Sequence, residues 1–207
     1  MIRYMPIARA RGGKDEFYNI VKSIEPSVKR LAFADELKLI CDEILLSALK
    51  LMETHGLFLP SEFSERILTD KAAKRAFLID FGTKIMRKRL PDIWRDVMVS
   101  VNLSTLNDSN FIISDCRFMN EFKILLNNYK VVPVLIDVDK DILFERYCRT
   151  SSDKSIESFN KIYNSETEQL HDELIDSSDS SIQHIDNNGT IEQYREQIVD
   201  LLFSEKG

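Results

Sequence analysis

The chain has 207 residues, of which 43% are hydrophobic and 30% charged, and its net charge is −6. This composition is typical of a soluble globular protein with one domain and a sizeable core. It disfavours general nucleic-acid binding, and the lack of a long apolar run disfavours a membrane span or a signal peptide. Three widely spaced cysteines indicate neither a metal site nor a disulfide framework, which favours a reducing cytoplasm.

The first part of the chain alternates short apolar runs with helix-compatible segments. Residues 2–8 are predicted to form a buried strand, residues 15–23 a helix that ends before Pro26, and residues 28–33 a second strand. Asp35 then stands where an N-cap is expected, in front of a long helix that ends near residue 54.

The middle of the chain carries no strand signal. Helices are predicted over residues 61–68, 69–81 and 92–102, with Gly82 interrupting or ending the second helix and Pro91 marking a break. Lysines and arginines gather between residues 71 and 95. We interpret residues 56–109 as a helical region that covers a substrate, although a solvated basic face explains most of these side chains more simply.

Strands return in the last half of the chain. They are predicted at residues 111–113, 131–138 and 181–185, and helices at 118–127, 139–149, 155–174 and 191–203. Strands that alternate with helices require crossover connections. We therefore expect an α/β fold, with a largely parallel central sheet flanked by helices on both faces.

A partial phosphate-binding motif lies between the first predicted strand and the first helix. The motif G-x-x-x-x-G-K-[ST] keeps Gly13 and Lys14, while Ala8 replaces its first glycine and Asp15 its hydroxyl residue. In such a loop, backbone N–H groups and the positive end of the next helix approach phosphate oxygens. Arginines at positions 9 and 11 would flank the phosphates. An ordinary strand-to-helix turn with solvated basic residues explains the same stretch about equally well.

Five stretches, taken in order, resemble the deoxynucleoside monophosphate kinases of bacteriophages, a branch of the P-loop kinases related to adenylate kinase. They are residues 12–15, 33–38, 81–83 with their basic flanks, 114–121 and 187–192. The loop of this family reads G-x-x-x-S-G-K-D-T, so that Asp15 is expected there. Ala8, Gly12 and Glu16 depart from the family pattern, and Ile79 stands where a glutamine is usual.

The resemblance implies a three-layer P-loop kinase fold and transfer of the ATP γ-phosphoryl group to a deoxynucleoside monophosphate (dNMP). It places the core of a single domain, residues 1–207, in residues 1–55 and 110–207, a substrate-binding helical region in about 56–109 and a lid in about 146–166. ATP and Mg²⁺ are the implied cofactors, in a cytoplasm that is the host's if the source is viral. The implied partners are small nucleotides, without nucleic acid or membrane, and homodimer formation is left open.

The resemblance also implies roles for individual residues. The residues implied in catalysis are Lys14, Arg117, Arg146 and Arg149. Those implied in ATP binding are Arg11, Gly12, Gly13, Lys14, Asp15 and Glu16. Those implied in acceptor binding are Asp35, Lys38, Arg75, Arg87, Trp94, Asp115 and Arg117. Mg²⁺ would be held through waters by Asp15 and Asp115, since this ion usually keeps several waters.

Simpler explanations remain open for several of these residues. Asp115 can cap the next helix while Arg117 pairs with Glu121, and a tryptophan at helical spacing is more often a core residue. Arg146 and Arg149 can pair with nearby carboxylates on the surface. Two other functions also remain open: a P-loop kinase for another phosphorylated small molecule, similar to phosphomevalonate kinases, and a degenerate protein that binds nucleotide without turnover.

Overall fold

The structure is a computed structural model that describes residues 1–56, 69–106, 108–175, 177 and 179–204. It divides into two compact units, which are considered separately below. The sheet unit consists of Met1–Ala32 and Leu106–Gly207, and the helical unit consists of Phe33–Thr105. The helix predicted over residues 61–68 lies outside the described residues.

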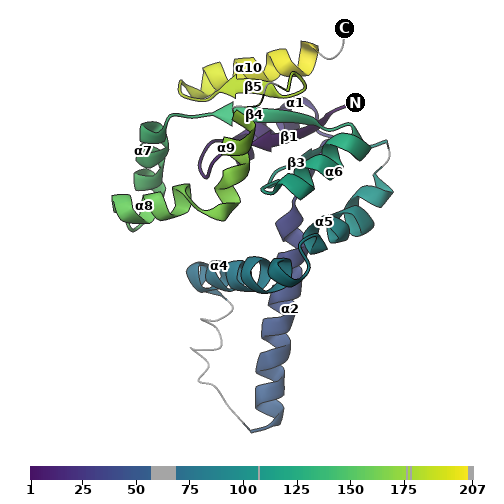
Figure 1. Ribbon diagram of the computed structural model, residues 1–207, viewed down its shortest axis with the longest axis vertical. Helices are drawn as coiled ribbons and strands as arrows, with labels where there is room; N and C mark the ends of the chain where they lie inside the picture. Colours follow the sequence, from purple (N-terminus) through teal and green to yellow (C-terminus); the bar gives the residue numbers. More distant parts are fainter. Residues whose placement is uncertain (57–68, 107, 176, 178, 205–207) are drawn as a thin grey trace. The chain divides into compact units, whose positions relative to one another are not determined.

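The sheet unit contains a five-stranded parallel sheet with the strand order β2-β3-β1-β4-β5 (Figure 1). At its centre, Tyr4 of β1 pairs with Ile112 of β3 on one side and with Val132 of β4 on the other. This arrangement confirms the predicted α/β class with a parallel sheet. The strands are β1 Arg3–Ile7, β2 Lys29–Leu31, β3 Phe111–Ile113, β4 Val132–Asp137 and β5 Gln183–Asp186.

Helices connect these strands and lie on both faces of the sheet (Figure 1). They are α1 Lys14–Ile24, α6 Met119–Tyr129, α7 Lys140–Thr150, α8 Ile156–Tyr163, α9 Gln169–Ile175 and α10 Ile191–Ser204. The single helix expected over residues 155–174 is wrong, because α8 ends at Tyr163 and a short 3₁₀ turn, Glu166–Glu168, precedes α9. Polar Asn164 and Ser165 stand at the break, and such side chains compete with helical backbone hydrogen bonds.

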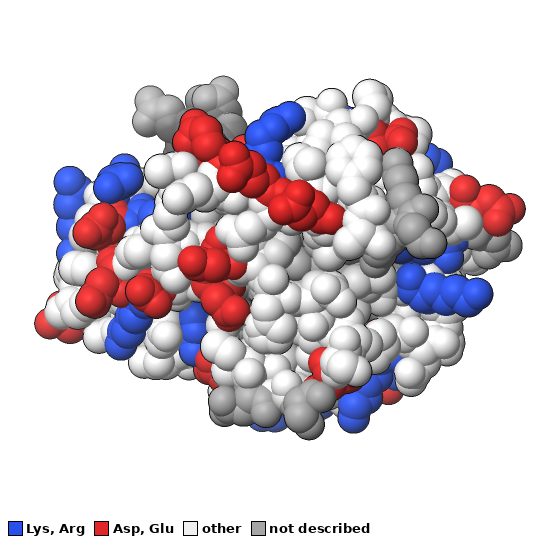
Figure 2. All heavy atoms as spheres, turned by 90° about the horizontal axis from the view of Figure 1, so that it is seen from above, with Lys and Arg blue, Asp and Glu red and all other residues white. Residues whose placement is uncertain are grey.

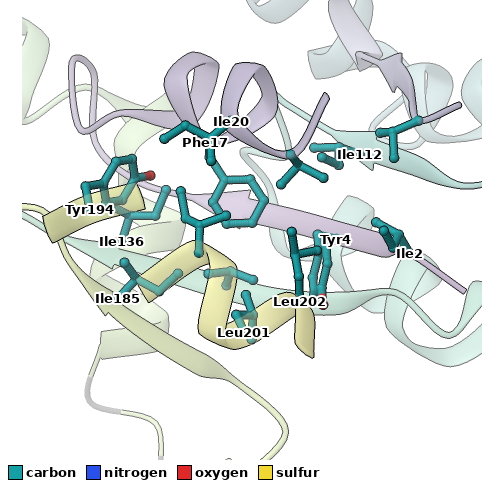
Figure 3. Packing of buried hydrophobic residues seen from close by; sticks show 14 of the residues in the cluster. Ile2, Tyr4, Phe17, Ile20, Ile112, Ile136, Ile185, Tyr194, Leu201 and Leu202 are labelled. Atoms are coloured by element: carbon teal, nitrogen blue, oxygen red, sulfur yellow. The ribbon is translucent and has the colours of Figure 1, made fainter. Parts of the chain in front are cut away.

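The main core lies between one face of the sheet and helices α1 and α10 (Figure 3). Tyr4 of β1 meets Phe17 of α1 edge to face, with ring centroids 5.9 Å apart, and Leu202 of α10 closes the cluster. Residues that alternate with these along the strands, such as Met5 and Leu135, are also fully buried. The sheet is therefore covered on both faces, as parallel sheets generally are, and β1 is a rigid support for the loop that follows it.

The helical unit begins with a long helix, α2 Phe33–Thr54, followed by α4 Lys71–Ile79, a π-helix Asp80–Arg87, α5 Ile93–Val97, a second π-helix Met98–Asn102 and a 3₁₀ turn Leu103–Thr105. Because α2 already begins at Phe33, Asp35 is not its N-cap, which corrects that prediction. Asp35 instead lies in the first turn and pairs with Lys38, with 2.7 Å between Oδ1 and Nζ. No helix in the described part of the chain is both long and apolar enough to cross a membrane.

The prediction that Gly82 interrupts or ends the second helix holds in part: α4 ends at Ile79, but a π-helix then continues through Gly82. A Cβ atom at this position would lie 2.5 Å from Cδ2 of Leu37 on α2, so that glycine permits the close approach of the two helices. The carbonyl oxygen of Gly82 accepts a hydrogen bond from the indole N–H of Trp94 at 3.0 Å. The glycine thus serves packing within the helical unit.

Candidate active site

The loop after the central strand has a tight conformation that depends on two glycines. Residues 8–13 connect β1 to α1, and the Gly12 N–H donates to the Arg9 carbonyl at 2.9 Å. Gly13 has a φ of 105°, which side chains rarely adopt, and a Cβ there would lie 2.4 Å from Nδ2 of Asn187. The same loop brings the N-terminus of α1, with its positive partial charge, to the carboxyl edge of the sheet.

Two departures from the family loop compensate for each other. A Cβ atom at Gly12 would lie only 2.7 Å from the Cβ of Ala8 and 2.9 Å from the Arg9 carbonyl oxygen. The methyl group of Ala8 therefore occupies the space that a side chain at position 12 would need. In this conformation both the Ala8 methyl group and the Arg9 carbonyl group favour glycine at position 12.

Three successive carbonyl groups of the loop accept hydrogen bonds from side chains elsewhere in the chain. The Arg11 carbonyl accepts from Nη1 of Arg146 at 3.3 Å, the Gly12 carbonyl from Nδ2 of Asn187 at 2.9 Å, and the Gly13 carbonyl from the Tyr194 hydroxyl at 3.2 Å. In a trans peptide the C=O and the next N–H point in opposite directions. The N–H groups of Gly13 and Lys14 are thereby directed away from these side chains, as phosphate binding requires.

Lys14 lies at the start of α1 and folds back over the loop. Its ammonium group donates to the carbonyl oxygens of Ala8 and Arg9, the latter at 3.3 Å. Burial, together with the positive charge of Arg117, lowers the pKa of Lys14 to about 8, against the opposing effect of nearby carboxylates. The carboxylates that raise this pKa belong to Glu168, Asp15 and Asp115. Lys14 therefore stands among four charged groups that come from three separate segments of the chain.

For the ATP-dependent activity proposed below, we expect kcat/KM to fall as the pH rises above about 8, because kcat/KM reports the unliganded protein, in which the Lys14 ammonium loses its proton near that pH. Initial rates between about pH 6.5 and 9.5 measure this limb. The variant Lys14→Arg retains its charge throughout this range, so its residual activity should lack the limb. A wild-type profile that stays flat over the whole range would show that the Lys14 charge is dispensable.

Arg117 and Asp115 follow β3, whose carboxyl end lies beside that of β1 because the two strands pair in parallel. The Arg117 side chain does not pair with Glu121, as the simpler explanation supposed; only its backbone N–H contacts that residue, at 3.0 Å. Its guanidinium donates to Oε1 of Glu168 at 3.1 Å. The second carboxylate oxygen of Glu168 accepts from the loop N–H of Ala10 at 2.6 Å. An anionic group thus already contacts the loop, which fits the binding of phosphate oxygens there.

The two arginines of the loop, Arg9 and Arg11, contact the surrounding helices and not the Glu168 carboxylate. Arg9 is buried, pairs with Asp172 of α9, donates to the Tyr163 carbonyl at 2.6 Å and lies 3.7 Å from the centroid of the Tyr163 ring. Arg11 donates from Nε to the Thr150 hydroxyl at 2.8 Å and packs over the Tyr147 ring. Both side chains therefore fasten the loop to α7, α8 and α9.

The two arginines predicted for the lid differ in their surroundings. Arg146 is partly buried and, besides the Arg11 carbonyl, contacts the Asn187 carbonyl at 2.7 Å. Arg149 is 76% exposed and faces Glu145 across 3.4 Å, as the simpler explanation supposed. In this conformation Arg146 supports the loop and Arg149 lies on the surface.

The other predicted acceptor-binding residues belong to the helical unit. Asp35 and Lys38 pair with each other, Arg75 is exposed, and Arg87 is partly buried. Trp94 is only 3% exposed and its indole N–H is bonded to Gly82, so it packs within the unit and offers no open face for a base. Its predicted part in acceptor binding stays a prediction.

The implied metal has two carboxylates available near the loop. Asp15 and Asp115 are both close enough to Lys14 to influence its pKa. Within the described ranges, no group of three or more His, Cys, Asp or Glu residues is arranged to hold a metal ion. Mg²⁺ often binds through one or two carboxylates together with substrate phosphates and waters, and these two residues fit the ion in that manner.

Three residues with contacts to the loop were not predicted to belong to the site. Asn187 lies in one of the stretches that carry the resemblance, but no role followed from its position. Glu168 and Tyr194 carry no motif at all, and their contacts to Ala10 and Gly13 span 158 and 181 residues of sequence. Among these three residues, only Asn187 had a recognisable sequence signal, because it begins the predicted turn over residues 187–189.

We expect Tyr194→Phe to lower the free energy of unfolding by about 1 kcal/mol, because it removes one hydrogen bond to the Gly13 carbonyl. Burial, with the nearby Glu16 charge, raises the pKa of Tyr194, so the hydroxyl remains a donor at any working pH. ATP affinity should weaken in parallel, as measured by calorimetry. Tyr18→Phe is the matched control, since the Tyr18 hydroxyl has no hydrogen-bond partner among the described residues. Equal effects of both variants would contradict the assigned support of the loop.

The fold of the chain, a parallel sheet of this order with a Gly-Lys loop after its central strand, is shared with proteins of known structure. Two solved structures show the likeness. Dephospho-CoA kinase from Campylobacter jejuni is 15% identical, with a TM-score of 0.51, over 99% of this chain and 97% of that one. TT1252 from Thermus thermophilus is 14% identical, with a TM-score of 0.61, over 100% of this chain and 98% of that one. No protein-family model and no curated protein matches the sequence.

Lysine and arginine side chains are arranged differently on the protein surface and at the loop. Figure 2 shows lysine and arginine side chains scattered among aspartates and glutamates on the face that it draws. At the loop, by contrast, the cationic groups of Arg9, Lys14 and Arg117 are drawn inward and face carboxylates or backbone carbonyls. The cationic groups at the loop are therefore engaged by carboxylates and carbonyl groups of the chain itself.

Proposed function

We propose that this protein is a kinase that transfers the γ-phosphoryl group of ATP to a deoxynucleoside monophosphate. The observation that carries the proposal is the convergence of Lys14, Arg117 and two acidic residues at the loop after the central strand. Phosphoryl transfer needs mainly positioning and neutralisation of charge, and these groups supply both. Asp15 and Asp115 would hold Mg²⁺ through waters, and the metal would neutralise charge on the phosphates.

The roles follow from the chemistry of each group. Lys14 would accompany the transferring phosphoryl group as a point charge, and Arg117 would clamp oxygens of the same group with its planar fork. Arg146 and Arg149 are proposed to approach it on closure of the lid, which would exclude water and so suppress ATP hydrolysis. The acceptor would be bound by the helical unit through Lys38, Arg75 or Arg87.

The test is an ADP-release assay with Mg²⁺-ATP and a panel of acceptors. The panel contains the four common dNMPs, their ribonucleotide counterparts and modified pyrimidine monophosphates. Turnover with at least one dNMP, at a rate well above ATP hydrolysis without acceptor, would support the proposal. Turnover only with a non-nucleotide acceptor would overturn the proposed substrate while leaving the kinase activity in place.

A second candidate acceptor class is supported by the comparison of folds. One structural neighbour is a dephospho-CoA kinase, so the acceptor panel includes dephospho-CoA and also mevalonate phosphate. A further alternative is a protein that binds nucleotide without transfer, which the departures at Ala8, Glu16 and Ile79 favour. Calorimetric binding of ATP without transfer to any member of the panel would select this alternative.

A further inference from the structure

The carboxylate of Glu168 is the most deeply buried charged group at the loop. Its side chain is 3% exposed, and both of its oxygens are engaged. Oε2 accepts from the Ala10 N–H at 2.6 Å, and Oε1 accepts from the Arg117 guanidinium at 3.1 Å. A buried carboxylate with this pair of donors is stabilised by charge-assisted hydrogen bonds, which are stronger than neutral ones.

The donors that Glu168 uses are of the type that a phosphoryl group uses. Backbone N–H groups of a glycine-containing loop and an arginine guanidinium both bind phosphate oxygens. The Glu168 carboxylate also lies close enough to the Lys14 ammonium to raise the pKa of Lys14. A carboxylate oxygen and a phosphate oxygen cannot both occupy the same position against the Ala10 N–H.

We propose that Glu168 is an internal occupant of a phosphoryl position in this site, which a bound nucleotide must displace. The proposal rests on the proposed nucleotide binding at the loop and adds a residue that opposes it. In the free protein, the carboxylate satisfies the Ala10 N–H and Arg117. In the complex, phosphate oxygens satisfy the same donors and Glu168 turns to solvent.

The location of Glu168 allows this displacement without the loss of neighbouring structure. Glu168 ends a 3₁₀ turn between α8 and α9, and the segment is tied to the loop on both sides of that turn. The ties are the contacts of Arg9 with the Tyr163 carbonyl and with Asp172. Only the short turn therefore has to move, while α8 and α9 keep their attachment to the loop.

The test measures the affinity of inorganic tripolyphosphate and of ATP by calorimetry, without any acceptor, for four forms of the full chain. Glu168→Gln keeps the shape of the side chain but removes its charge. Glu168→Asp keeps the charge but withdraws the carboxylate by one bond, about 1.5 Å, from its donors. Glu166→Gln is the matched control, because Glu166 is exposed and belongs to the same turn.

We expect both Glu168 variants to bind tripolyphosphate and ATP at least ~10-fold more tightly than the wild type, the scale of a hydrogen bond to a charged group. Without ligand, their melting temperatures should fall, since the ion pair to Arg117 is weakened. A purely structural role would lower stability and affinity together, whereas displacement moves them in opposite directions. The Glu166→Gln control should match the wild type in both measurements.

Several results would overturn the inference. Unchanged or weaker binding by both Glu168 variants would do so, and tightening in Glu168→Gln alone would indicate long-range repulsion in place of displacement. Absence of binding in all four forms would overturn it together with the assignment of the loop. Tighter binding by the variants without transfer to any acceptor would support the inference while removing the proposed kinase activity.

Discussion

Replacing Lys14 with methionine is expected to lower kcat by at least ~100-fold, the scale of losing one preorganised electrostatic contact. Methionine keeps a similar length and flexibility, so the change removes mainly the charge. The Lys14 ammonium group donates hydrogen bonds to the carbonyl groups of Ala8 and Arg9. It lies near the Arg117 guanidinium and the carboxylates of Glu168, Asp15 and Asp115. Steady-state rates with the best acceptor from the panel measure the effect.

The matched control for this variant is Lys123→Met. Lys123 is an exposed lysine on α6, so its replacement removes one positive charge from the protein without touching the loop. Melting temperatures of both variants establish that they are folded. Turnover of Lys14→Met within a few-fold of the wild type would remove the loop from the mechanism.

Gly13→Ala is expected to weaken ATP binding by at least ~100-fold through two effects that act together. The first is strain, because a φ of 105° is rarely adopted by a residue with a side chain. The second is a collision: the new Cβ would lie 2.4 Å from Nδ2 of Asn187, the group that holds the Gly12 carbonyl. The loop must shift, and the directed N–H groups of Gly13 and Lys14 shift with it.

Gly56→Ala separates these two effects. Gly56 also has a positive φ, of 72°, but a Cβ there would meet nothing within 4 Å. This control should lower the free energy of unfolding by about 1–2 kcal/mol from strain alone and leave ATP affinity unchanged. Urea unfolding and calorimetry measure the two quantities. Retention of wild-type ATP affinity by Gly13→Ala would contradict the requirement for this loop conformation.

The fold was predictable because its signals are local. The apolar run Phe111–Ile113 forms β3 with the predicted bounds, and the five predicted strands all appear in the sheet. Other features depend on packing partners elsewhere in the sequence. Leu37 and Trp94 contact Gly82 within the π-helix, and neither contact is visible in a local pattern.

Sequence motifs could name some of the residues that the structure gathers at the loop, but not the residues whose contacts depend on the whole fold. Lys14 and Arg117 lie in the segments that follow β1 and β3, whose carboxyl ends a parallel sheet must bring together. Glu168 belongs to the site only because the helix expected over residues 155–174 breaks before it. Its contact with Ala10 follows from that break and from the fold as a whole, and no spacing rule predicts it.

The attachment of the loop to the last helix has a consequence for the order of folding. The groups that orient the loop, Asn187 and Tyr194, lie 175 and 181 residues after their partners Gly12 and Gly13. During synthesis, therefore, the loop cannot acquire its final shape until residue 194 has left the ribosome, although the loop itself emerges early. Contacts of such long separation also slow folding, because much of the chain must be ordered before they form. Competence to bind a phosphorylated ligand would thus appear late and would report that the sheet unit is complete.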